Sequence, residues 1–190
     1  MEHEQDSTGV SRGQNQLYVL PEDWHAAANV TEPLLDRVDR GLPGVQLLVV
    51  TNDAEASAAI AARIGLSVSQ RGLRVIAATE SRRASRILRS APAHVVVAPA
   101  AVLVELLEST VLKLDAVRVV VLAWVDDLTQ SSTRALETLM SEVPKDAARL
   151  VVATAATPAV EQLVERYARR ARRMQPVASE SGRASCRERV

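Results

Sequence analysis

The acidic residues that close the apolar run "VRVVVLAWVDDL" (117–128) are the first candidates for chemistry. Carboxylates at the end of a buried strand can hold Mg²⁺ and orient a water molecule that attacks a phosphate. Here the run ends in Ala123 and Trp124, and Asp126 and Asp127 come only afterwards. The same two aspartates also suit the start of a helix, because Gln130 follows Asp127 at the spacing of a capping box. Both interpretations stay open at this point.

Six short, valine-rich segments alternate with stretches of helical pattern. The apolar segments are 17–20, 45–50, 73–78, 94–99, 117–124 and 149–156, and the helical ones are 22–40 (interrupted at Pro33), 53–64, 80–90, 99–110, 132–143 and 158–173. Continuous apolar runs are typical of strands buried on both faces of a parallel sheet. The alternation predicts an α/β fold, a single domain with a doubly wound, mainly parallel sheet.

Composition narrows the class of protein. A chain of 190 residues with 47% hydrophobic and 24% charged residues forms one well-buried domain, and global disorder is excluded. The 23 basic and 23 acidic residues cancel, so net charge favours neither nucleic acid nor a membrane surface. No apolar run approaches the ~20 residues of a membrane span, and the polar N-terminus lacks a signal peptide. We therefore expect a cytoplasmic protein without a membrane partner.

The cysteine and histidine residues of the sequence indicate neither a disulfide nor a metal site. The single Cys186 excludes an internal disulfide. His3, His25 and His94 lie far apart and lack metal-ligand spacing, so no metal site is expected.

The two ends of the chain differ from the rest. Residues 1–16 are predicted to be a disordered tail, 17–173 the domain, and 174–181 the start of a linker. We interpret "GRASCRERV" (182–190) as the translation of a sequencing adapter, which would make Cys186 foreign and the chain a fragment.

The loops after the strands carry a recognisable order of motifs. They are "TNDAEA" (51–56), "APAA" (98–101), "WVDDL" (124–128) and "ATAAT" (153–157). In this order they resemble P-T-R-E-L, T-P-G-R, D-E-A-D and S-A-T of the first RecA-like (P-loop NTPase-like) domain of DEAD-box RNA helicases. The resemblance covers residues 17–173 and rests on order and spacing, since no motif is intact.

The positions at which the sequence departs from the family include those that bind and hydrolyse ATP in that family. The segment "PEDWHAAANV" (21–30), in the place of the P-loop, has no glycine and no lysine, and Glu22 and Asp23 add negative charge. The resemblance puts the family's metal-binding Asp on Ala123 and its catalytic Glu on Trp124, leaving only the final Asp, Asp126. It thus implies no intact catalytic or nucleotide-binding residue, and neither ATP nor Mg²⁺ as a cofactor of this fragment.

The resemblance also marks positions for RNA. Thr51, Glu55 and Pro99 are retained, whereas the register of "ATAAT" leaves Thr154 and Thr157 as alternatives. Two arginine groups have helical spacing: Arg82, Arg83, Arg86 and Arg89, and Arg166, Arg169, Arg170, Arg172 and Arg173. Each group is either an electrostatic footprint for RNA or a solvated helix face.

Three functions remain in view. The leading hypothesis is a degenerate DEAD-box-like domain that binds or remodels RNA together with a second RecA-like domain in the same protein. The alternatives are an ATP-dependent RNA helicase that is still active at full length, and a protein-interaction scaffold. An exposed apolar patch centred on Trp24 and Trp124 would favour the scaffold.

Overall fold

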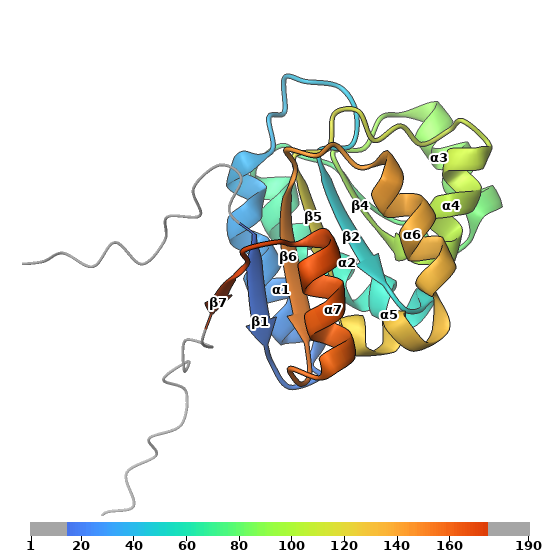
Figure 1. Ribbon diagram of the computed structural model, residues 1–190. Helices are drawn as coiled ribbons and strands as arrows, with labels where there is room; N and C mark the ends of the chain where they lie inside the picture. The colour runs from blue at the N-terminus through green and yellow to red at the C-terminus, as the bar shows by residue number, and fades with distance from the viewer. Residues whose placement is uncertain (1–14, 175–190) are drawn as a thin grey trace, which may run out of the picture.

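One seven-stranded sheet, in which all neighbouring strands are parallel, forms the centre of the structure (Figure 1). The computed structural model of the chain describes residues 15–174, leaving aside the side chains at 130 and 131. The strands are β1 (Gln16–Val19), β2 (Leu47–Thr51), β3 (Val75–Ala77), β4 (Val95–Pro99), β5 (Val119–Leu122), β6 (Ala148–Ala153) and β7 (Arg172–Met174). Their order across the sheet is β3-β4-β2-β5-β6-β1-β7.

Helices cover both faces of this sheet, which confirms the predicted doubly wound α/β fold. They are α1 (Trp24–Thr31), the 3₁₀ helix η1 (Glu32–Arg37), α2 (Ala54–Gln70), α3 (Ser81–Ser90), α4 (Ala100–Glu108), α5 (Val125–Ser131), α6 (Thr133–Glu142) and α7 (Pro158–Tyr167). Helices α3 to α7 pack on one face, and α1, η1 and α2 on the other (Figure 1). The predicted interruption at Pro33 falls at the start of η1.

The strand side chains alternate between two hydrophobic cores. In β2, Leu48 and Val50 belong to the core under α3 to α7, whereas Leu47 and Val49 belong to the core under α1 and α2. All of β2 is buried. Because both faces of the strand exclude water, both sets of positions are apolar, and the segment shows no polar alternation.

The end of the last helix differs from the prediction. Helix α7 stops at Tyr167 instead of running to 173, and the chain turns through Arg170, which has a φ of 59°. Strand β7 then pairs with β1, and the Arg172 N–H donates to the Asn15 carbonyl at 2.9 Å. Pairing with the open edge of β1 satisfies backbone groups that a longer helix would have used.

Two other helices were misjudged. Helix α2 continues past its predicted end at 64 to Gln70, because Ile60, Ile64 and Val68 extend one buried stripe across Gly65. Strand β5 ends at Leu122, two residues early, and α5 follows almost directly where a loop was predicted.

Most of the predicted tail (1–16), linker (174–181) and adapter-derived segment (182–190), with Cys186, lies outside the described residues. Asn15 and Gln16 are nonetheless part of the fold. The Asn15 side chain accepts from the Arg149 N–H and donates to the Arg169 carbonyl, both at 3.0 Å. Within 15–174 there is no helix of the length and apolarity needed to cross a membrane.

Candidate functional site

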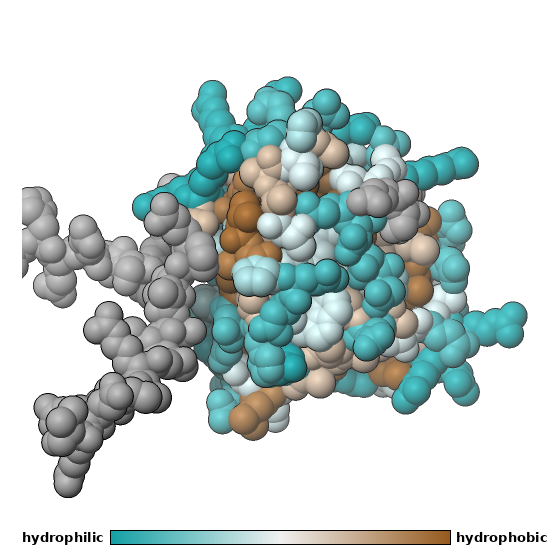
Figure 2. Space-filling model, turned by 90° about the horizontal axis from the view of Figure 1, so that it is seen from below, coloured by the Kyte–Doolittle hydropathy of each residue, from teal (hydrophilic) through white to brown (hydrophobic). Residues whose placement is uncertain are grey.

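The loops that follow the strands meet at one edge of the sheet, where parallel α/β proteins bind their ligands. In Figure 1 the arrowheads of β1 and β6 point downward, so Figure 2 looks onto this edge from below. Hydrophilic side chains form most of its rim, and apolar ones gather in a smaller patch (Figure 2).

Trp124 fills the end of β5. The strand's pairing continues through the Ala123 N–H, which donates to the Val50 carbonyl at 2.9 Å. Trp124 then adopts a left-handed conformation (φ 55°, ψ 60°), at a cost of about 1–3 kcal/mol for a bulky residue. Its side chain is 0% exposed, and its Nε1–H has no hydrogen-bond partner among the described residues.

A second tryptophan packs against the first. The ring centroids of Trp24 and Trp124 lie 6.3 Å apart at an interplanar angle of 61°, an edge-to-face contact. Trp24 is half-buried as the first residue of α1. Because Trp124 is fully buried, it cannot contribute to the exposed apolar patch that would have favoured the scaffold hypothesis.

A carboxylate of the chain itself lies at the N-terminus of α1, the helix after β1. Asp23 is the N-cap of α1, and its carboxylate accepts from the His25 N–H at 3.0 Å. Glu22 and Asp23 are both exposed. The free N–H groups of a helix N-terminus would otherwise attract a phosphate. Here the position is already taken by a carboxylate of the chain.

Asp126 joins the loop after β6 to the end of β5. Its Oδ2 accepts from the Thr154 N–H at 2.7 Å. Thr157 does something different, because its hydroxyl caps α7 by accepting from the Val160 N–H at 3.3 Å. Of the two candidate threonines, Thr154 is therefore the one opposite Asp126.

Asp126 and Asp127 do not cap the next helix as the capping-box interpretation required. Helix α5 begins at Val125, with Trp124 at its N-cap position, so both aspartates lie in the first turn. Carboxylates there stabilise a helix through its macrodipole. Asp127 also accepts from the Asn52 side chain at 3.3 Å, which links α5 to the loop after β2.

Of the three residues retained at the family's RNA-contacting positions, two are buried in local contacts. The Thr51 hydroxyl is buried, donates to the Asp53 carbonyl at 2.9 Å and contacts the Ser57 hydroxyl at 2.6 Å. Pro99 is buried at the N-cap of α4. Only Glu55 presents its side chain to solvent, and its negative charge repels phosphate. None of the three offers a positive or donating side chain to RNA.

The arginines of α3 are exposed and unpartnered. Arg82, Arg83, Arg86 and Arg89 project from the helix, whose buried contact is Ala84. Their side chains make no hydrogen bond or ion pair with any residue of the described range. The structure thus keeps the predicted arginine-bearing helix and leaves these charges open to solvent.

The C-terminal arginines are arranged differently from the prediction. They do not share one helical face, because α7 ends at Tyr167 and Arg172 and Arg173 lie in β7. Three of them form ion pairs: Arg166 with Glu137 at 2.6 Å, Arg169 with Glu165 at 3.4 Å and Arg173 with Glu161 at 2.8 Å. This group therefore has much of its charge matched by neighbouring acids.

Metal-binding clusters and shifted pKa values point to few further candidate site residues. Within residues 15–174 no three His, Cys, Asp or Glu side chains gather closely enough to hold a metal ion. His94 accepts from the Arg74 N–H at 3.0 Å as part of the β3 edge. Burial raises the pKa of Tyr18, and the positive charge of Arg172 opposes that shift. Burial likewise raises the pKa of Tyr167.

No protein-family model and no curated protein sequence matches the chain. Solved structures do match. A DEAD box protein from the hyperthermophile Methanococcus jannaschii superposes with a TM-score of 0.76 and 16% identity over 85% of this chain and 45% of that one. A hypothetical ATP-dependent RNA helicase from Sulfolobus tokodaii gives a TM-score of 0.73 and 16% identity over 86% of this chain and 48% of that one.

A third match is S. cerevisiae Dbp5 bound to Nup159, Gle1, IP6 and ADP, with a TM-score of 0.73 and 14% identity over 85% of this chain and 43% of that one. The chain thus spans less than half the length of these proteins. At such low identity the likeness concerns the fold. The resemblance inferred from the loop motifs is confirmed at that level: the chain has the RecA-like α/β fold found in DEAD-box RNA helicases.

Proposed function

We propose that the chain is an RNA-binding domain related to RNA helicases, and that this domain neither binds nor hydrolyses ATP. The observation that carries the absence of ATP binding is the complete burial of Trp124 at the end of β5, in contact with Trp24. A tryptophan in that place fills space and offers no oxygen to a metal.

The residues present do not fit a triphosphate and its metal. The position before Trp124 is Ala123, also 0% exposed, so neither side chain is a carboxylate. The N-terminus of α1 is capped by Asp23, and no lysine stands near it in the sequence. The remaining acid, Asp126, has one oxygen committed to the Thr154 N–H. We therefore derive no reaction step through ATP or Mg²⁺.

RNA as the partner is supported by the fold and by charge. Two of the matching structures are a DEAD box protein and a hypothetical ATP-dependent RNA helicase, which supports RNA as the class of ligand. The exposed Arg82, Arg83 and Arg86 supply the positive charge, while the buried Thr51 and Pro99 serve to position α2 and α4. We further propose a second RecA-like domain in the same protein and a cytoplasmic location.

Fluorescence anisotropy with a labelled single-stranded RNA at low salt tests the proposal. We expect saturable binding that weakens as salt is added, with no gain in affinity when Mg²⁺ and ATP are present. A malachite-green phosphate assay with RNA present serves as the companion measurement. We expect no phosphate release above that of heat-unfolded protein.

Two results would overturn the proposal in different parts. Absence of RNA binding at every salt concentration would remove the RNA assignment. Release of phosphate from ATP that depends on RNA would restore the helicase alternative and show that groups other than carboxylates at 123 and 124 do the chemistry.

A further inference from the structure

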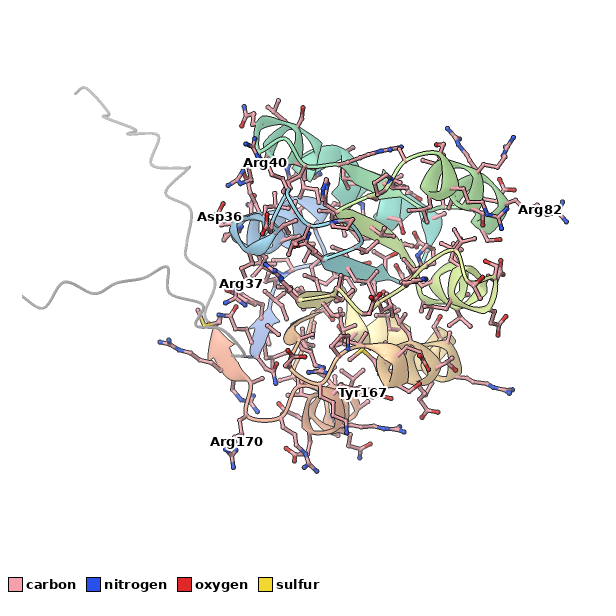
Figure 3. All side chains as sticks on the ribbon, turned by 90° about the horizontal axis from the view of Figure 1, so that it is seen from above. Asp36, Arg37, Arg40, Arg82, Tyr167 and Arg170 are labelled. Carbon is pink, nitrogen blue, oxygen red and sulfur yellow. The ribbon has the colours of Figure 1, made fainter. Side chains whose placement is uncertain are left out.

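Helix α3 concentrates positive charge without any acid of its own. Its ten residues include Arg82, Arg83, Arg86 and Arg89 and no Asp or Glu. Arg82, Arg86 and Arg89 follow one another at i, i+4 and i+7, so they share the face opposite the buried Ala84. In Figure 3 Arg82 points away from the body of the domain, and Arg170 lies on the opposite side of the molecule.

This charge arrangement opposes formation of the helix. Arg82 and Arg83 lie in the first turn, at the positive end of the helix macrodipole. Arg82 and Arg86, and Arg86 and Arg89, are like-charged pairs at the spacings where side chains meet. The N-cap residue, Glu80, makes no side-chain hydrogen bond, so only its negative charge at this end and Arg89 in the last turn offset these terms.

Helix α7 shows the arrangement that folding favours. It has Glu161 in its first turn, Arg166 in its last turn, and a threonine N-cap that bonds to the backbone. Helix α6 also places an arginine, Arg134, in its first turn and a glutamate, Glu142, at its end, but it carries Glu137 between them. Among the helices of residues 15–174, α3 is the one with four arginines and no acid. Contacts within the described domain therefore do not explain the four arginines of α3.

We propose that α3 is the face on which this domain binds the phosphodiester backbone of RNA. The inference rests on the proposed function and adds the surface and the chemical group. Arg82, Arg86 and Arg89 form a row that spans about 10 Å, at a rise of about 1.5 Å per residue. An anionic strand along this row relieves both the like-charge repulsion and the unfavourable interaction with the helix dipole.

The fourth arginine, Arg83, borders a groove beside the row. Arg83 and Ile87 line a groove of about 380 Å³ together with Arg74, Thr79 and residues of the β3 edge. Arg83, Arg74 and Thr79 are the lining residues whose side chains carry hydrogen-bond donors. Such donors suit phosphate oxygens, and guanidinium groups bind them in a bidentate manner.

The chemistry predicts backbone binding with little sequence preference. Phosphate contacts fix the position of a nucleic acid and carry no base information directly. α3 has no aromatic residue on which a base could stack. The domain should therefore bind single-stranded RNA of any sequence, with an affinity set by salt.

The test compares two triple variants of the whole 190-residue chain. R82Q/R86Q/R89Q removes the row, and R169Q/R170Q/R172Q removes the same charge at the β7 edge. We expect the first to weaken binding of a labelled single-stranded RNA by about 10- to 100-fold at low salt. The slope of log K against log salt should fall in magnitude by about 2, at roughly 0.7 per phosphate contact. The control variant should stay within about threefold of the unmodified chain.

The outcomes separate this inference from the proposed function. If the unmodified chain binds RNA and R82Q/R86Q/R89Q binds equally well with the same salt slope, the α3 assignment is wrong and RNA binding stands. If the unmodified chain does not bind, the proposed function fails as well. Polyglutamate serves as a competitor: displacement of RNA at equal charge concentration would overturn the assignment in favour of an acidic protein partner.

Folding of the variant is checked by thermal unfolding. Since the arginines oppose helix formation, R82Q/R86Q/R89Q should melt at the same temperature as the unmodified chain or higher. A lower melting temperature would contradict the charge argument itself.

Discussion

Two regions that follow parallel strands differ in the side chains that they place where a ligand could approach. At the ends of β1 and β5, two tryptophans pack together and a chain carboxylate caps the helix N-terminus. After β3, at one margin of the sheet, α3 exposes four arginines that meet no acid of the described chain. The sheet fixes where a ligand can approach, and the side chains at each place decide what it is. In the first region packed side chains fill the space, and we call it the closed region. In the second region charged side chains stay exposed to solvent, and we call it the open region.

The largest expected effect is on the closed region. Trp124→Ala removes the largest fully buried side chain and its contact with Trp24, and we expect a loss of about 3–5 kcal/mol in the free energy of unfolding. Urea denaturation followed by circular dichroism measures it. Leu66→Ala is the control, because Leu66 is 70% exposed and its loss should change stability by less than about 0.5 kcal/mol. A loss below about 1 kcal/mol for Trp124→Ala would mean that this region is not closed by packing.

The second effect concerns the remaining carboxylate of that region. Asp126→Ala removes the 2.7 Å hydrogen bond from the Thr154 N–H and a favourable charge in the first turn of α5. We expect a loss of about 1–2 kcal/mol, again by urea denaturation. Asp126→Asn retains an acceptor oxygen and should lose less. Equal stability of all three proteins would argue that Asp126 is kept for something other than structure.

A smaller effect of opposite sign is expected in the open region. Arg82→Glu places a favourable charge at the start of α3 and creates an i, i+4 pair with Arg86. We expect a gain of about 0.5–1 kcal/mol in stability together with weaker RNA binding. Arg169→Glu is the matched change at the other sheet edge, where it replaces the ion pair with Glu165 by a repulsion. If Arg82→Glu destabilises the domain, the arginines of α3 serve folding, and the contrast between the regions disappears.

The smallest effect is an alkaline loss of stability. Burial raises the folded-state pKa of Tyr18 and of Tyr167 above the ordinary value of 10.0. The folded chain then binds more protons than the unfolded chain above about pH 10, so stability is full below that pH and falls as pH rises through the raised pKa. Urea denaturation at about pH 9 and about pH 11 measures the loss. Tyr18→Phe, on the tryptophan side of the sheet, should reduce the difference.

The sequence predicted the sheet well because its central strands are buried on both faces. The segments around Val49, Val97 and Val121 are continuously apolar for that reason. Strand β7 was missed because Arg172–Met174 has no apolar pattern, and only backbone pairing with β1 makes it a strand. Helix α5 was missed because its seven residues give little periodicity to detect.

The residue types at the candidate site can be read directly from the sequence, whereas the contacts between those residues cannot. The absence of glycine, lysine and an acidic pair is visible in the sequence itself. The edge-to-face contact of Trp24 with Trp124 joins residues far apart in the chain, and the Asp126 to Thr154 hydrogen bond spans 28 positions. Neither leaves a local pattern. The exposure of the α3 arginines followed from helical spacing, whereas their lack of acidic partners required the surrounding fold.

One measurement addresses both regions at once: the melting temperature of the chain with saturating single-stranded RNA and, separately, with Mg²⁺ and ATP. A ligand that binds the folded state raises stability by about 2.7 kcal/mol at a hundred times its Kd. We predict a higher melting temperature with RNA, an effect that added salt removes, and no change with Mg²⁺ and ATP. A rise with Mg²⁺ and ATP, and none with RNA, would contradict the account.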